Sequence, residues 1–173
     1  MPQAAAPAAA FSTCDFCDLH TQEQGGPFRV LPPGLQSFGG RTAFFGQVST
    51  VQCFEDNSLV KAALDTPGAG RVLVVDGAGS LRRALVGGNV AAAAARNGWA
   101  GVVVHGCVRD AEELAAAGVG IRALGLVPMP TVKRGEGQRD VPVAVLGVWI
   151  HPGDWLYADQ DGVVVNDTPL HAG

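Results

Sequence analysis

Two short apolar runs, each followed by a turn and a helix-like segment, constrain the fold of this chain more than any other feature. The first spans residues 72–75 and the second residues 102–104. Strands that are apolar on both faces are typical of parallel sheets covered by helices. Both runs are far shorter than the roughly 20 residues that a membrane-spanning helix needs. We therefore expect an α/β fold with a parallel βαβ core and no membrane partner.

The rest of the chain alternates between strand and helix patterns and then changes character. A first helix starts at Ser12 or Thr13 and runs to Leu19, and a Pro/Gly-rich loop follows. The expected ranges are 25–40 for this loop, 42–54, 71–75 and 101–108 for strands, and 57–65, 89–96 and 110–117 for helices. Short strands at 141–148, 155–158 and 163–165, with a hairpin turn at Asp161-Gly162, predict an added β-rich layer.

Length and charge limit the domain count and the partners. A chain of 173 residues, 47% hydrophobic and 16% charged, is the size of one α/β domain, expected at 11–173. Residues 1–10 are Ala/Pro-rich without the positive charge of a secretory signal, so we expect a short flexible lead-in. The net charge of -4 and the lack of a Lys/Arg run argue against direct nucleic-acid binding.

The four cysteines form no complete metal-binding pattern. Cys14 and Cys17 stand in a CxxC arrangement that zinc or redox sites use, but Cys53 and Cys107 do not complete a second pair. We expect reduced cysteines in a cytoplasmic protein.

A glycine turn follows the first apolar run. Asp76-Gly77-Ala78-Gly79 resembles the start of a nucleotide or methyl-donor loop, because glycines let backbone amides approach a ligand. Arg82 stands where a third glycine belongs, and no acidic residue ends a following strand about 20 residues on. We interpret the segment as a tight strand-to-helix turn.

Two other segments meet at the expected carboxyl edge of the sheet, where α/β folds place their ligand crevices. Residues Gly87, Gly88, Asn89 and Val90 begin a helix, whose free N–H groups favour a carboxylate or phosphate. Arg109 and Asp110 follow the second apolar run. Alternatively, Asn89 and Asp110 serve only as helix caps. Together, the helix start and Arg109 can bind the carboxylate of a small oxo acid, while Asp110 offers a hard oxygen ligand to Mg²⁺ or Mn²⁺.

The chain resembles a known family on residues in the same order over most of its length. Gly88 and Arg109-Asp110 form a Gly-x20-Arg-Asp arrangement. The other matching segments are Cys17-Asp18, Phe38-Gly39-Gly40-Arg41, Gln52-Cys53-Phe54-Glu55-Asp56-Asn57, Arg71-Val72-Leu73-Val74-Val75-Asp76-Gly77, Gly153-Asp154 and Tyr157-Ala158-Asp159. The family contains the regulator of ribonuclease activity A and the class II 4-hydroxy-4-methyl-2-oxoglutarate aldolases.

The resemblance implies a swivelling sandwich of α and β layers that assembles as a homotrimer. It implies that Gly87 to Val90 and Arg109 bind substrate, that Arg109 is catalytic, and that Asp110 binds the metal. The implied reaction is cleavage of 4-hydroxy-4-methyl-2-oxoglutarate to pyruvate, with oxaloacetate decarboxylation through the same pyruvate enolate. Some members carry a menaquinone methyltransferase label, which the glycine turn does not support.

The same family also implies a non-enzymatic alternative. Its ribonuclease regulators bind and inhibit the endonuclease that initiates RNA turnover, and the segment Cys53 to Asn57 is similar in them. One regulator has glutamine where this chain has Asp110. Because a carboxylate binds a divalent cation better than an amide does, the metal-dependent lyase is the first hypothesis.

Some roles stay open at this point. The proton acceptor for the C4 hydroxyl is either a metal-bound water near Arg109 or an acid of a neighbouring subunit. His105 lies within a strand and is interpreted as a core residue rather than a ligand. Trp99, Trp149 and Trp155 are expected to be core or subunit contacts.

Overall fold

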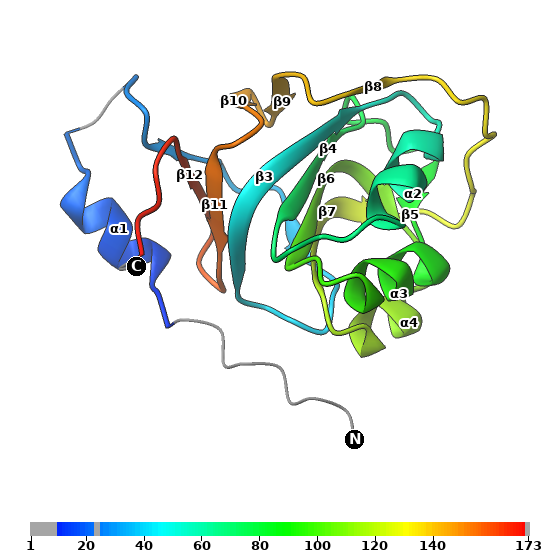
Figure 1. Cartoon of the computed structure of the whole chain (residues 1–173), viewed down its shortest axis with the longest axis horizontal. Helices are drawn as coiled ribbons and strands as arrows, with labels where there is room; N and C mark the ends of the chain where they lie inside the picture. Colours follow the sequence, from blue (N-terminus) through cyan, green and yellow to red (C-terminus); the bar gives the residue numbers. More distant parts are fainter. Residues whose placement is uncertain (1–9, 23–24, 172–173) are drawn as a thin grey trace.

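One long strand, β3 (Phe44–Gln52), joins the two halves of the sheet in the computed structural model, which describes residues 10–22 and 25–171 (Figure 1). The other elements are α1 (Thr13–Leu19), β1 (Arg29–Val30), β2 (Gln36–Ser37), α2 (Ser58–Leu64), β4 (Val72–Asp76), β5 (Ala84–Val86), α3 (Gly88–Arg96), β6 (Gly101–Val108), α4 (Ala111–Ala116), β7 (Gly120–Leu126), β8 (Gln138–Arg139), β9 (Val143–Val145), β10 (Val148–Ile150), β11 (Trp155–Ala158) and β12 (Val163–Asn166).

The sheet order is β1-β12-β11-β3-β4-β6-β7-β2, with β5 beside β6 and β8 beside β3. Strands β3, β4, β6 and β7 are parallel, whereas β1, β12, β11 and β3 pair antiparallel. The first residues of β3 pair with β11 and its later residues pair with β4. The predicted parallel core with an added β-rich layer is therefore confirmed.

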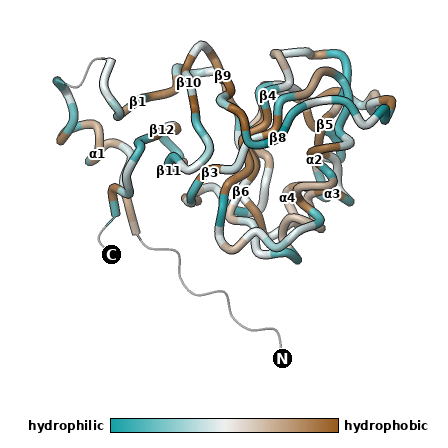
Figure 2. The backbone as a smooth tube through the Cα atoms, turned by 45° about the horizontal axis from the view of Figure 1, so that its top comes forward, coloured by the Kyte–Doolittle hydropathy of each residue, from teal (hydrophilic) through white to brown (hydrophobic). Residues whose placement is uncertain are grey.

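The parallel strands are buried on both faces because their two sets of side chains enter different cores. On β4, Leu73 and Val75 pack with apolar residues of α2 and α3. Val72 and Val74 point to the other side and pack with residues of β9 to β12. Figure 2 shows the hydrophobic segments on β4 and β6, and Figure 1 shows α2, α3 and α4 together on one side of these strands. Burial on both faces favours apolar residues at successive positions, which explains the continuous runs at 72–75 and 102–104.

The predicted helices and longer strands are confirmed within a few residues. Ser12 is the N-cap of α1, where its Oγ accepts a hydrogen bond from the N–H of Asp15 at 3.2 Å. Helix α3 ends at Asn97, and Gly98 has the left-handed φ of +78° that the predicted cap requires. The part of the predicted lead-in at residues 1–9 lies outside the described residues.

Two predictions are wrong in detail, and two strands of the parallel half were not predicted. The expected loop at 25–40 contains the strands β1 and β2, each only two residues long. They are strands because β1 pairs with β12 and β2 pairs with β7. The expected strand at 141–148 is a hairpin of β9 and β10, because Leu146 and Gly147 both have positive φ, at +49° and +79°. Strands β5 and β7 complete the parallel half without having been predicted.

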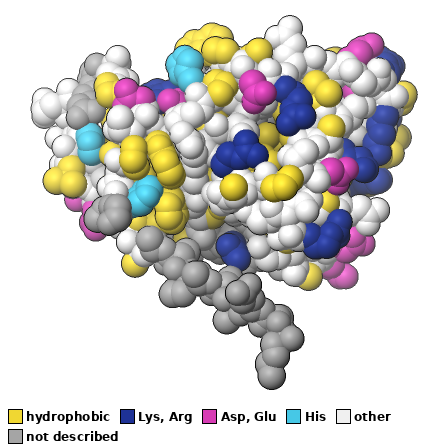
Figure 3. Space-filling view, in the orientation of Figure 1, with side chains coloured by type: hydrophobic (Ala, Val, Ile, Leu, Met, Phe, Trp, Pro, Cys, Tyr) yellow, Lys and Arg dark blue, Asp and Glu magenta, His cyan; other side chains and the backbone are white. Residues whose placement is uncertain are grey.

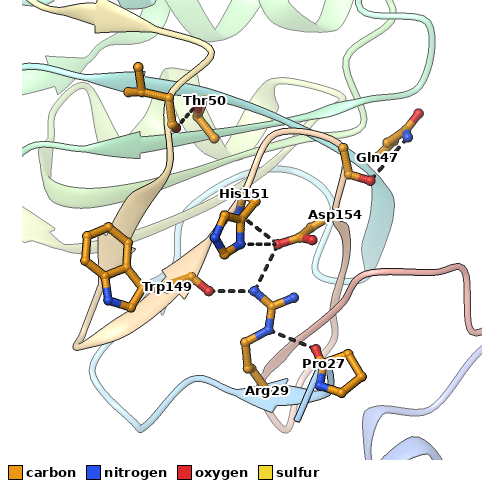
Figure 4. A network of polar contacts seen from close by, with 9 residues as sticks. Pro27, Arg29, Gln47, Thr50, Trp149, His151 and Asp154 are labelled. Carbon is orange, nitrogen blue, oxygen red and sulfur yellow. Dashed lines mark hydrogen bonds and ion pairs between the residues drawn. The ribbon is translucent and has the colours of Figure 1, made fainter. Parts of the chain in front are cut away.

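A polar network fastens the antiparallel layer (Figure 4). Arg29 on β1 donates from Nη1 to Oδ2 of Asp154 at 2.9 Å and to the carbonyl of Trp149 at 2.6 Å. The same carboxylate oxygen accepts the N–H of His151 at 2.8 Å. Asp154 is 6% exposed, and its carboxylate together with these two donors fixes β1 and β10 against the turn before β11.

The two buried cysteines, Cys53 and Cys107, have the character of structural thiols. All four cysteines are free, and burial, followed by the charges of Asp56 and Asp76, raises the pKa of Cys53 to about 12. A high pKa keeps a thiol protonated and unreactive. Trp99 is a core residue at 3% exposed, whereas Trp149 is 59% exposed. No helix in the described part of the chain is long and apolar enough to cross a bilayer.

Candidate functional site

A cavity of about 470 Å³ opens where β5 and β6 end and α3 begins. Its lining residues are Asn57, Lys61, Ala84, Gly87, Gly88, Asn89, Val90, Arg109, Asp110, Pro130, Thr131 and Lys133. The structure thus brings together all six residues that the sequence predicts for the site, although they come from two separate segments. Their chemical roles stay predictions.

Asp110 is fixed to the start of the neighbouring helix. Its Oδ2 accepts a hydrogen bond from the backbone N–H of Gly88, the first residue of α3, at 2.8 Å. Asp110 has φ +65°, a left-handed conformation that is costly for a residue with a side chain. It precedes α4 but makes no side-chain cap bond to that helix. Asp110 thus occupies the N-cap position of α4, as the alternative expects, but its carboxylate is turned to α3 instead of bonding to its own helix.

The start of α3 needs glycine because other side chains approach its backbone closely. A Cβ at Gly87 would lie 2.8 Å from Oδ2 of Asp110 and 3.4 Å from Nε of Arg109. A Cβ at Gly88 would collide with the side chain of Glu113. Gly87 occupies the N-cap position, so the alternative in which Asn89 caps the helix is wrong. Asp110 already accepts the N–H of Gly88, and the N–H groups that follow at this helix N-terminus are suited to receiving a second anionic group.

Arg109 is held loosely. Within the described part of the chain its guanidinium makes two long contacts, one from Nε to Oδ2 of Asp110 at 4.0 Å and one from Nη1 to the carbonyl of Pro128 at 3.4 Å. The side chains of Arg109 and Asp110 both remain 40% exposed. A guanidinium has five N–H donors, so most of them are available to a ligand in the cavity.

A second wall comes from the start of α2 and from the segment after β7, which sequence reasoning missed. Asn57, 8% exposed, donates from Nδ2 to the carbonyl of Leu85 at 3.1 Å. Its Oδ1 accepts the hydroxyl of Thr131 at 2.8 Å. The sequence offered Asn57 as a helix start and as the end of a family-like segment, but not as a site residue. It gave no local signal for Thr131, which this hydrogen bond brings to the cavity.

Asp56 fastens the segment that carries Thr131. It is 2% exposed, and its Oδ2 accepts the N–H groups of Arg134 and Glu136 at 2.9 and 3.1 Å. Burial by itself raises the pKa of Asp56. Hydrogen bonds from the hydroxyl and N–H of Ser58 and from these two N–H groups have the larger, opposite effect, and the pKa falls from 3.8 to about 2. The carboxylate therefore stays charged at neutral pH and holds the second wall in place.

The charges around the cavity favour an anion. Lys61, Arg109 and Lys133 contribute three cations, and Asp110 is the one acidic residue among the lining residues. In Figure 3, Lys and Arg side chains gather over the half of the molecule that carries α2, α3 and α4. An anionic ligand entering this cavity would meet a positive potential.

Asp110 can serve as a metal ligand only in a sparse coordination shell. In the described ranges, no group of three or more His, Cys, Asp or Glu side chains is placed to hold a metal ion. Its accessible carboxylate is a hard donor, and Mg²⁺ is commonly bound through one or two carboxylates while it keeps several waters. The donor set fits Mg²⁺ or Mn²⁺ and does not fit a closed zinc site.

The glycine turn after β4 uses its own N–H groups. Ala78 donates its N–H to Oδ1 of Asp76 at 2.9 Å, and those of Gly77 and Gly79 donate to the carbonyl of His105 at 3.1 Å. These amides are not presented to a phosphate, which agrees with the interpretation as a structural turn. His105 lies beside this turn, with Nδ1 3.8 Å from Oδ1 of Asp76, and is not among the residues that line the cavity.

Comparison with known proteins gives relatives that match nearly the whole chain. A protein of Albidiferax ferrireducens, named "Putative 4-hydroxy-4-methyl-2-oxoglutarate aldolase", is 62% identical over 164 residues, which cover 90% of this chain and 95% of the relative. A protein of Burkholderia multivorans with the same name is 57% identical and covers 92% of this chain and 98% of its own length.

Solved structures match over a similar share of the chain. The RNA-processing inhibitor RraA of Thermus thermophilis superposes with a TM-score of 0.88 at 48% identity, covering 94% of this chain and 96% of that one. A Geobacillus kaustophilus protein, titled S-adenosylmethionine: 2-dimethylmenaquinone methyltransferase, gives 0.87 at 44% identity, covering 94% and 100%. The sandwich fold that the resemblance implied is confirmed.

A family model described as "RraA-like: Aldolase/RraA" matches residues 13–165, which include both segments of the cavity. The match confirms the resemblance drawn from the Gly-x20-Arg-Asp arrangement. This chain is a member of the RraA-like family.

Proposed function

We propose that this protein is a divalent-metal-dependent carbon-carbon lyase that cleaves 4-hydroxy-4-methyl-2-oxoglutarate to pyruvate. The observation that carries the proposal is the meeting of Arg109, Asp110 and the start of α3 in one positively charged cavity. The names of the relatives support a lyase. Oxaloacetate decarboxylation is a second proposed activity, because loss of CO₂ from oxaloacetate gives the same pyruvate enolate.

Each group would have a distinct task. Arg109 would bind the substrate carboxylate through two parallel N–H donors, and the N–H groups of Asn89 and Val90 at the first turn of α3 would add to its binding. Asp110 would hold Mg²⁺ or Mn²⁺, which when bound would polarise the 2-oxo group and stabilise the enolate. The hydrogen bond from Gly88 would orient the Asp110 carboxylate for this task.

The proton acceptor would be one of two groups. Asp110 is the one acid lining the cavity, and in this proposal it is the metal ligand. The proton of the C4 hydroxyl would then go to a water near Arg109 or to an acid of a neighbouring subunit.

A homotrimer forms part of the proposal. Leu126, Met129 and Val132 follow one another at the carboxyl end of β7, and each is more than half exposed. Exposed apolar side chains that gather near a site are typical of subunit contacts. Light scattering on the purified protein would give three times the mass of 17.7 kDa if the trimer forms.

The test is pyruvate release from 4-hydroxy-4-methyl-2-oxoglutarate and from oxaloacetate, with Mg²⁺ or Mn²⁺ and then with excess chelator. Turnover that the chelator abolishes is the expected result. Absence of pyruvate from both substrates in the presence of metal would overturn the proposal.

The second candidate is a regulator that binds and inhibits an RNA-degrading endonuclease. The similarity to the RNA-processing inhibitor over 94% of the chain favours it. Purified protein would slow the endonuclease at stoichiometric amounts, and Asp110→Asn would inhibit equally, because inhibition would use the outer surface. The two functions are compatible.

A further inference from the structure

Two lysines line the same cavity as Arg109 but belong to neither predicted segment. Lys61 is on α2, and Lys133 is on the segment between β7 and β8. They add two positive charges to a cavity in which Arg109 and the start of α3 already suffice for one carboxylate. This excess of cations needs an explanation.

Lys61 is available to a ligand. Its Nζ lies 2.9 Å from Oδ2 of Asp65 one turn further along α2, and the two side chains are 51% and 46% exposed. An exposed pair of this kind contributes little net free energy, so a substrate carboxylate can replace Asp65 at low cost.

Lys133 stands on a backbone that is fixed on both sides. Thr131 is bonded to Asn57, and the N–H of Arg134 is bonded to the buried Asp56. Among the described residues, Lys133 forms no ion pair. A charged side chain on an anchored segment, facing a cavity without a carboxylate partner of its own, is placed to meet one on a ligand.

We infer that Lys61 and Lys133 bind the distal carboxylate of the substrate and make the site selective for 2-oxo acids with two carboxylates. The inference rests on the proposed function in placing the 2-oxo acid end at Arg109. A volume of about 470 Å³ exceeds what pyruvate needs and accommodates a five-carbon dicarboxylate.

The kinetic consequence follows from the position of the lysines. In 4-hydroxy-4-methyl-2-oxoglutarate the distal carboxylate keeps its charge during cleavage, so a contact to it is made in both the ground state and the transition state, and its loss raises KM and leaves kcat nearly unchanged. In oxaloacetate the distal carboxylate is the group that leaves as CO₂, so this expectation applies to the aldol substrate. An Arg109 variant would lower kcat instead.

The experiment compares two ligands of equal length that cannot undergo aldol cleavage. 2-Oxoglutarate has a distal carboxylate, and 2-oxopentanoate has a methyl group in its place. Calorimetry with Mg²⁺ present would measure both for the wild type, Lys61→Gln, Lys133→Gln and the double variant. Each lysine is expected to contribute about 2- to 5-fold to 2-oxoglutarate affinity and nothing to 2-oxopentanoate affinity.

Two matched variants sharpen the test. Arg96→Gln removes a positive charge from the far end of α3, outside the cavity, and is expected to leave both affinities unchanged. Asp65→Asn frees Lys61 from its partner and is expected to tighten 2-oxoglutarate by up to about 2-fold. Thermal melting would show that each variant is folded.

The outcomes separate this inference from the proposed function. Equal wild-type affinity for the two ligands, failure of both to bind, or an equal loss of both in the lysine variants would overturn the inference. Because neither ligand is cleaved, a lysine-dependent preference without pyruvate release would refute the lyase and leave the dicarboxylate site standing.

Discussion

The backbone N–H of Gly88 donates to Oδ2 of Asp110 at 2.8 Å, and this bond joins two segments that are 22 residues apart in the chain. It places a carboxylate at the positive end of α3. It also leaves Arg109, the preceding residue, beside the same helix end. The Gly-x20-Arg-Asp arrangement therefore brings its three residues together in space, with Gly88 and Asp110 joined by a hydrogen bond and Arg109 beside them.

Replacing Asp110 by asparagine separates its charge from its structural contact. The amide oxygen can still accept the Gly88 N–H, so we expect unfolding free energy to change by about 1 kcal/mol or less. Metal-dependent pyruvate release is expected to be lost, because an amide is a much weaker ligand for Mg²⁺. Pyruvate assays and thermal melts would test both parts. Full activity of Asp110→Asn would show that the carboxylate serves only to hold α3.

Gly88→Ala is expected to destabilise the protein, although alanine usually favours helices. The new Cβ collides with the side chain of Glu113, and overpacking of this kind costs about 1–3 kcal/mol. Urea unfolding would measure the loss. Gly118→Ala is the matched control, since nothing lies within 4 Å of a Cβ at that position. Adding Glu113→Ala to Gly88→Ala should restore part of the stability, and no restoration would refute the steric explanation.

Arg109→Lys is expected to lower kcat/KM without affecting the fold. Lysine keeps the charge but cannot form two parallel hydrogen bonds to a carboxylate. Loss of one charge-assisted bond of about 1.5–3 kcal/mol corresponds to about a 10- to 100-fold decrease. Steady-state kinetics would measure it, with Arg96→Lys as a control outside the cavity. Wild-type kinetics for Arg109→Lys would mean that Arg109 does not bind substrate.

The parallel half of the fold was predictable because its signal is local. Strands β4 and β6 carry continuous apolar runs at 72–75 and 102–104, which are buried on both faces, and caps such as Ser12 and Gly98 mark the helix ends. Strand β7 was not predicted because it contains Arg122 among its apolar residues. Arg122 is 5% exposed, and its guanidinium donates to the carbonyls of Thr42 and Asp159, contacts that only the folded chain provides.

The candidate site was predictable on one wall only. Gly88, Arg109 and Asp110 follow strand ends, and a parallel sheet brings such residues to one edge. Lys61 reads in the sequence as an ordinary solvent-exposed helix position. Lys133 lies in a segment without regular structure, which reaches the cavity through contacts with Asp56 and Asn57. Long-range side-chain anchors of this kind leave no periodic pattern in a sequence.

Asp56 makes stability depend on pH in a defined acidic window. Its pKa is lowered from 3.8 to about 2 in the folded protein, so its contribution is fully present above pH 3.8 and is lost as the pH falls toward 2. The difference corresponds to about 2 kcal/mol. An asparagine at this position could not accept all the bonds that Asp56 receives from Ser58, Arg134 and Glu136.

We therefore expect Asp56→Asn to unfold at a lower urea concentration than the wild type at pH 7, with a free energy of unfolding that is smaller by about 2 kcal/mol. The free energies of the two proteins should converge near pH 2. Asp65→Asn, which alters an exposed carboxylate on α2, should follow the wild type throughout. A constant difference between Asp56→Asn and the wild type from pH 7 to pH 2 would mean that the charge of Asp56 does not hold the second wall. Because that wall carries Lys133, loss of the anchor should also weaken 2-oxoglutarate binding at pH 7 while leaving 2-oxopentanoate binding nearly unchanged.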